Sequence, residues 1–135
     1  MLPEGLRNLP YLVHTNRELG LMLRGQKPMA CFMDFPEIMP ECVVRYLRMF
    51  DRYVEQGRFS KRLHIHHITA KGCPYPECHE IFYTLPGEEW RVQAKLDLYN
   101  SPESWSASHE RKLGELLGYT DWQIDFWLRG FREAN

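Results

Sequence analysis

The segment Glu89–Tyr99 has the most regular hydrophobic pattern in the chain. In the run EWRVQAKLDLY, apolar residues alternate strictly with polar residues from Trp90 to Leu98. Successive side chains of a β-strand point to opposite faces of the sheet, so this alternation is typical of an antiparallel strand with one buried and one solvated face. We therefore expect 89–99 to be a strand, which restricts the chain to folds that contain a sheet.

Three further segments complete the expected sheet. Met29–Phe35 is a short apolar run with the length of a buried strand. Leu63–Ala70 and His79–Leu85 are rich in β-branched and aromatic residues, and a Pro-Gly turn separates the second of them from Glu89. The pattern predicts a three-stranded meander over about 63–99, with an additional strand near 29–35.

Helical periodicity occurs outside these segments. Val43, Leu47, Phe50 and Val54 recur every three or four residues, which places them on one face of a helix. A second helix is expected between Ser101 and Gly118, and a third follows Thr120. With a short helix before Gly25, about four helices would pack on one face of a mostly antiparallel sheet, which is an α+β fold.

Length and charge restrict the class of protein. A chain of 135 residues has the size of a single globular domain, 1–135. Its formal net charge of −1 argues against an overall electrostatic attraction to nucleic acid or to an anionic membrane. The chain has no signal-peptide pattern and no apolar stretch of membrane-spanning length. We expect a cytoplasmic protein whose four cysteines are reduced thiols.

The stretch 63–81, LHIHHITAKGCPYPECHEI, contains four of the six histidines and two of the four cysteines. Pairing the apolar faces of its two strands favours a register with Ile65 opposite Tyr83, in which His67 and His79 are diagonal neighbours. Cys73 and Cys78 are expected in the connecting loop. Thiolates and imidazoles are the ligands that zinc prefers, so the stretch predicts a zinc site, structural or in a small metal-dependent hydrolase, formed by His67, Cys73, Cys78 and His79.

An alternative interpretation of this stretch needs no metal. Pro74 and Pro76 favour an extended loop. The two cysteines at the ends of such a loop would be too far apart to bind the same metal ion or to form a disulfide. In that case Leu63–Ala70 is a strand that carries histidines, and Cys73 and Cys78 are small loop residues.

Two short matches to known enzyme families occur in the same stretch. The run L-H-I-H-H-I, residues 63–68, resembles the histidine-triad signature, which implies nucleotidyl hydrolysis with a histidine nucleophile. Here the third histidine, His67, comes one residue early and falls on the other face of the strand. His67-Ile68-Thr69 resembles one half of the two-histidine phosphoesterase pattern, whose second half this chain lacks. We therefore assign no catalytic role from either family.

His66 and Glu80 are the candidate pair for acid–base chemistry, because the favoured register places them close together on the more polar face. A cross-strand histidine and glutamate are also a common surface contact. The sequence does not decide whether the protein is an enzyme.

A basic segment lies between Arg45 and Arg62, with six basic residues against two acidic ones. Arg45, Arg48 and Arg52 follow helical spacing, so they predict a face that could bind phosphate groups or an acidic partner. The alternative is a solvated helix face. Nucleic acid is not the expected partner, because the segment predicts no aromatic platform interleaved with these arginines on which bases could stack.

The segment TDWQIDFWLRGF, residues 120–131, carries two apolar stripes on one predicted helix. Ile124, Trp127, Leu128 and Phe131 form the first, and Trp122 and Phe126 form the second. If the first stripe packs on the domain, Trp122 and Phe126 are left as an interface for a partner protein or a second copy. The alternative is that both stripes are core.

These patterns favour a binding, interaction or regulatory module that acts through its aromatic C-terminal helix. A zinc-binding protein or metal-dependent hydrolase centred on 64–79 is the first alternative. A phosphate or nucleic-acid binder that uses Arg45, Arg48 and Arg52 is the second.

Overall fold

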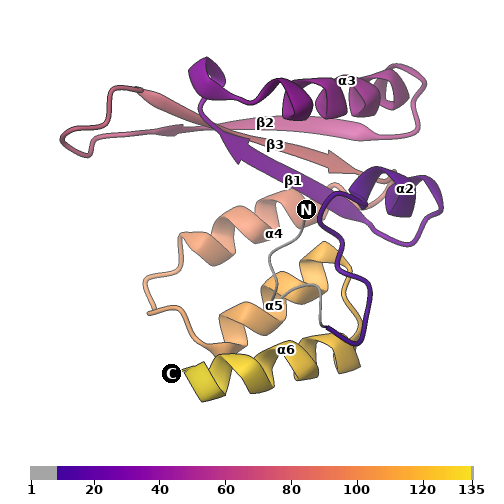
Figure 1. Ribbon diagram of the computed structural model, residues 1–135, viewed down its shortest axis with the longest axis vertical. Helices are drawn as coiled ribbons and strands as arrows, with labels where there is room; N and C mark the ends of the chain where they lie inside the picture. Colours follow the sequence, from indigo (N-terminus) through magenta and orange to yellow (C-terminus); the bar gives the residue numbers. More distant parts are fainter. Residues whose placement is uncertain (1–8, 135) are drawn as a thin grey trace. The chain divides into compact units, whose positions relative to one another are not determined.

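The computed structural model describes residues 9–134 and has the predicted α+β fold (Figure 1). Five α-helices and three strands occur in this part of the chain. They are α2 (Glu18–Leu23), β1 (Met29–Asp34), α3 (Glu41–Glu55), β2 (Ser60–His67), β3 (Glu77–Thr84), α4 (Trp90–Tyr99), α5 (Ala107–Leu117) and α6 (Asp121–Ala134), with a short 3-10 helix, η1 (Pro36–Ile38), before α3. None of the helices described is long and apolar enough to cross a membrane.

The chain divides into two compact units. The sheet unit comprises Met29–Val92, and the helical unit comprises the described parts of Met1–Pro28 and Gln93–Asn135. The boundary between them falls inside α4. We describe each unit by itself, and the expectation of a single domain over 1–135 stays a prediction.

The sheet unit is a three-stranded antiparallel sheet in the order β1-β3-β2, with β3 in the centre. Ala30 on β1 and Lys61 on β2 both lie opposite Tyr83. Phe82 and Tyr83 project from opposite faces of β3, and both are fully buried. The central strand is therefore covered on both faces at this point.

Helix α3 packs on the face of the sheet that carries Phe32 and Tyr83 (Figure 1). The Phe50 ring stacks on the Tyr83 ring, with centroids 4.6 Å apart, and meets Phe32 edge-on at 5.4 Å. The Tyr83 hydroxyl donates a hydrogen bond of 2.8 Å to Asp51. Burial and this bond raise the pKa of Tyr83, so it stays a neutral donor. The helix that Val43, Leu47, Phe50 and Val54 predict is confirmed.

The prediction of a strand at 89–99 is wrong, because Trp90–Tyr99 forms helix α4. The segment also satisfies a helical pattern, since Val92, Lys95 and Leu96 lie on one helical side and are all buried. Its Ala, Leu, Lys, Gln and Arg residues have high helix propensity, and only Val92 is β-branched. The expected strand near 29–35 is present as β1, and it provides the third strand of the sheet.

The predicted strand register also differs from the observed one. Ile65 lies opposite His79 instead of Tyr83, a shift of four residues that leaves each side chain on its expected face. The prediction assumed that β2 matches the apolar residues of β3. In the structure β1 and α3 match them, whereas β2 is an edge strand whose Leu63 and Ile65 are exposed.

The helical unit is built on the hairpin of α5 and α6. Helix α5 begins after Ser106, whose hydroxyl accepts from the backbone N–H of His109, and it ends at Gly118 in a left-handed conformation. It therefore starts later than the predicted Ser101. In the turn before α6, the backbone N–H of Thr120 donates to the side chain of Gln123. Ile124 and Leu128 on α6 are buried.

Substituting Gly118 tests the corner between α5 and the N-terminal segment. Gly118 has a φ of 93°, and a Cβ there would lie 2.5 Å from Cδ of Pro28. We expect Gly118→Ala to lower the free energy of unfolding by about 1–3 kcal/mol in urea titrations, since both the backbone and the contact become strained.

Gly130→Ala is the matched control. Gly130 lies in α6, where a Cβ would meet no atom within 4 Å. The same substitution should there raise the free energy of unfolding by about 0.5–1 kcal/mol, because alanine has the higher helix propensity. Equal effects at the two positions would contradict the described corner.

Candidate functional site

The four candidate zinc ligands are not gathered as one set. Strand β3 begins at Glu77, so Cys78 and His79 are consecutive strand residues that point to opposite faces, and Cys78 is not in the loop as expected. His67 remains a diagonal neighbour of His79, but its side chain is 79% exposed. Among residues 9–134, no group of three or more His, Cys, Asp and Glu residues is arranged to hold a metal ion. Zinc binding stays a prediction.

The two cysteines of this stretch are free thiols in different surroundings. Cys73 lies in the loop between β2 and β3, with Sγ 3.4 Å from the carbonyl oxygen of Tyr75. Cys78 is buried, and burial, followed by the charges of Asp34 and Glu80, raises the pKa of its thiol. A raised pKa favours the neutral thiol over the thiolate that metals and electrophiles require.

His66 and Glu80 lie in contact, as the sequence predicts. The expectation that this face is the more polar one is wrong, because Cys78, Glu80 and Phe82 on this face of β3 are all buried. Nε2 of His66 is 2.8 Å from Oε1 of Glu80, whose residue is 2% exposed. The pair is diagonal across β2 and β3, because Glu80 lies directly opposite His64. The His64 ring meets the His66 ring at 4.6 Å and flanks the pair. A buried carboxylate that orients a half-exposed imidazole is suited to proton transfer, and its catalytic role stays a prediction.

Arg45, Arg48 and Arg52 are exposed on α3, as their helical spacing predicts. Arg45 forms an exposed ion pair of 3.4 Å with Glu41 one turn earlier. Exposed pairs of this kind contribute little to stability. Because the pair is weak and all three arginines are exposed, this face is accessible to an anion. Anion binding stays a prediction.

Aromatic rings are exposed on the helical unit. Trp122 and Phe126 on α6 are 52% and 37% exposed. The ring of Tyr11 meets them edge-on, at centroid distances of 5.4 Å and 6.2 Å. We call Tyr11, Trp122 and Phe126 the aromatic surface. The other predicted stripe is partly core, because Ile124 and Leu128 are buried while Trp127 is half-exposed; the side chain of Phe131 lies outside the described residues.

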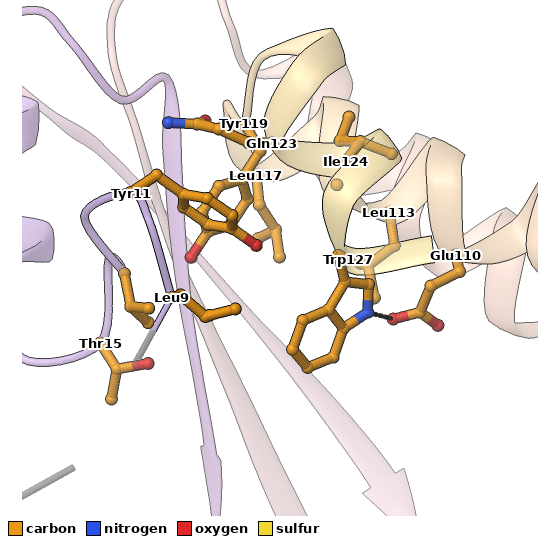
Figure 2. A pocket seen from close by; sticks show the side chains of 12 residues that line it. Leu9, Tyr11, Thr15, Glu110, Leu113, Leu117, Tyr119, Gln123, Ile124 and Trp127 are labelled. Carbon is orange, nitrogen blue, oxygen red and sulfur yellow. Dashed lines mark hydrogen bonds between the residues drawn. The ribbon is translucent and has the colours of Figure 1, made fainter. Parts of the chain in front are cut away.

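A pocket of about 240 Å³ adjoins the aromatic surface within the helical unit (Figure 2). It lies between the N-terminal segment 9–15 and the facing sides of α5 and α6, and Tyr11 belongs to both the pocket and the surface. Figure 2 shows Tyr11, Tyr119 and Trp127 around it, with Leu9 and Leu113 contributing aliphatic lining. The sequence could not have predicted this pocket, because about a hundred residues separate Tyr11 from the helices that complete it.

Glu110 lies at the edge of this pocket, where two indole groups hold its carboxylate. Nε1 of Trp127 donates to Oε1 over 3.0 Å, and Nε1 of Trp105 donates to Oε2 over 2.7 Å. Trp105 is itself stacked on Tyr99, with centroids 5.0 Å apart. Hydrogen bonds to an ionised group are stronger than neutral ones, so these two exposed bonds orient the carboxylate.

A buried polar cluster anchors the N-terminal segment beside the pocket. The ammonium group of Lys27, in a residue that is 3% exposed, donates to the carbonyl oxygen of Leu117 over 2.7 Å and lies 2.9 Å from Nδ1 of His14. The His14 ring stacks on the Tyr119 ring at 3.8 Å, and the backbone N–H of His14 donates to the Tyr119 hydroxyl over 3.1 Å. Because Lys27 donates, Nδ1 of His14 must accept, which requires the neutral imidazole.

The electrostatics of the cluster agree with this assignment. Burial, together with the charge of Lys27, lowers the pKa of His14 to about 4. Burial also raises the pKa values of Tyr11 and Tyr119. At neutral pH the imidazole and both phenols are therefore uncharged.

Comparison with known proteins found no matching family model, no matching curated protein and no matching solved structure.

The His14 cluster predicts a specific loss of stability in acid. The unfolded chain binds a proton on His14 near the ordinary pKa of 6.5, whereas the folded chain binds it only near pH 4. Stability should therefore be unchanged by this group above about pH 6.5 and should fall by up to about 3 kcal/mol as the pH drops to about 4. Urea titrations across this pH range measure the effect.

His14→Gln is the comparison variant, because glutamine can accept from Lys27 but does not titrate. Its free energy of unfolding should depend less steeply on pH between about 6.5 and 4 than that of the parent protein. Parallel pH profiles for the two proteins would show that His14 is not the source of the acid sensitivity.

Proposed function

We propose that this chain is a protein-binding module that docks its partner on the aromatic surface formed by Tyr11, Trp122 and Phe126. The observation that carries the proposal is the exposure of Trp122 and Phe126, at 52% and 37%. Moving a large aromatic ring out of water and into an interface is favourable in free energy. Rings of this type are also enriched among the residues that dominate binding energy at protein interfaces.

The aromatic rings have defined positions before any partner binds, and this supports the proposal. Edge-on contacts with Tyr11 hold both rings in the free protein, and the buried bonds of Lys27 and His14 anchor the segment that carries Tyr11. Binding then requires little ordering of side chains, and this reduces the entropic cost of association.

Charged residues around the rings are suited to the rim of an interface. The Arg129 guanidinium lies 5.4 Å from the centroid of the Phe126 ring, and Arg111 is paired with Asp125 on the same helix as the rings. Interfaces of moderate affinity commonly combine an aromatic centre with a polar, solvated rim. The partner is a protein surface, which can be a second copy of this chain, and we place the interaction in the cytoplasm.

The double variant Trp122→Ala/Phe126→Ala tests this function. Each ring at the centre of an interface contributes about 2 kcal/mol or more, so loss of both should weaken partner binding by at least about 100-fold. Sedimentation velocity over a range of concentrations measures self-association. Quantitative affinity capture from cells of the source organism measures binding to other proteins.

Trp90→Ala is the matched control, because Trp90 is 57% exposed but lies in the sheet unit. Circular dichroism should show all three proteins folded. The proposal is contradicted if the parent protein stays monomeric and if the double variant retains the same captured proteins as the control.

Two alternatives from the sequence stay as proposals with their own readouts. Zinc binding by the stretch 64–79 requires about one zinc per chain in the purified, untagged protein and loss of that zinc in Cys78→Ser. Anion binding by Arg45, Arg48 and Arg52 requires affinity for a polyanion that decreases steeply with salt.

A further inference from the structure

The pocket beside the aromatic surface is smaller than a typical ligand or cofactor site. Its volume of about 240 Å³ is below the range of roughly 300–1,000 Å³ that is typical of sites for drug-sized ligands and cofactors. Tyr11 lines the pocket and also belongs to the aromatic surface. A partner seated on that surface can therefore insert a side chain into it.

Aromatic rings form much of the pocket wall. Tyr11, Tyr119 and Trp127 contribute rings, and Leu9, Leu113 and Leu117 contribute aliphatic groups (Figure 2). The faces of such rings carry negative electrostatic potential and attract ammonium and guanidinium groups. The aliphatic groups match the hydrocarbon stem that lysine and arginine carry below their charge.

One carboxylate makes the charge of the pocket lining negative. Of the described residues that line it, Glu110 is the only one with a charge at neutral pH. The Lys27 ammonium does not line the pocket but lies 5.8 Å from the centroid of the Tyr119 ring. A bound cation is therefore expected beside Glu110 and Trp127 and not over Tyr119. The two indole N–H groups occupy one position on each carboxylate oxygen. A carboxylate has about four acceptor positions, so Glu110 can still accept hydrogen bonds from a ligand without moving.

We propose that this pocket binds a basic side chain, a lysine or an arginine, of the partner protein. The stem lies along the aliphatic lining, and the charged group lies beside the Trp127 ring and the carboxylate of Glu110. An acidic or neutral polar side chain would gain nothing from Glu110 and would lose its hydration against the apolar wall. The biological role of this pocket rests on the proposed protein-binding function, whereas its preference for a cation can be measured separately.

The test titrates the full chain with three small probes: N-acetyl-lysine methylamide, N-acetyl-arginine methylamide and the uncharged N-acetyl-norleucine methylamide. The indole ¹⁵N–¹H signals of Trp105 and Trp127 are the readout, because both groups donate to Glu110. We expect the basic probes to shift these signals with millimolar affinity and norleucine to bind at least about tenfold more weakly. Equal affinity for norleucine, or no shift with either basic probe, would overturn the proposal.

Glu110→Gln preserves the size of the side chain and removes its charge. It should weaken the binding of the basic probes by about tenfold and leave the binding of the norleucine probe unchanged. Glu103→Gln removes an exposed charge outside the pocket and should change neither. If Glu110→Gln does not fold, Trp127→Leu replaces an aromatic wall by an aliphatic one and should weaken the basic probes selectively, with Trp105 as the remaining reporter.

The double variant Trp122→Ala/Phe126→Ala separates this inference from the proposed function. Neither substituted residue lines the pocket, but both contact Tyr11, which does. The ratio of lysine-probe to norleucine-probe affinity, and not the affinity itself, should therefore match that of the parent protein even where the partner is lost. Cation binding without any effect of the double variant on partners would contradict the proposed function alone. Partner binding without cation selectivity would contradict this inference alone.

Discussion

The ammonium group of Lys27 lies at the C-terminal end of α5, where it donates to the carbonyl oxygen of Leu117 and to the ring of His14. A cation at this end of a helix satisfies a free carbonyl and interacts favourably with the helix dipole. Gly118 allows Pro28 to approach closely at the same corner. These contacts fix the N-terminal segment against the α5–α6 hairpin. The pocket and the aromatic surface both depend on that arrangement, since Tyr11 contributes to each.

Local patterns in the sequence predicted the elements whose environment is local. The spacing of Val43, Leu47 and Phe50 predicted α3, because one face of that helix packs on the sheet. The two apolar stripes on one helix left open whether the second is core or exposed, and Trp122 and Phe126 are exposed. The contact between His66 and Glu80 was also predicted, because the shift in register was even and preserved the faces of both strands.

Features that depend on distant segments could not be predicted in this way. The alternation in Trp90–Tyr99 is compatible with a strand, yet helix propensity and the burial of Val92 and Leu96 favour α4. The register of β2 differs from the expected one, since β3 pairs with β1 on its other side and β2 is an edge strand. The pocket joins Leu9 and Tyr11 to Glu110 and Trp127, and neither segment carries a motif that indicates the other. The metal candidates shared a stretch of sequence but lie on different faces of the sheet.

In the free protein the N-terminal segment is docked on α5 and α6, where it forms the pocket and the aromatic surface. Nuclear Overhauser spectroscopy of the unliganded protein tests this most directly. We expect cross-peaks from the ring protons of Tyr11 to those of Trp122 and Phe126, and from His14 to Tyr119, because these rings are in contact. Absence of these cross-peaks in a folded protein would show that neither the pocket nor the aromatic surface is preformed, and would contradict the account.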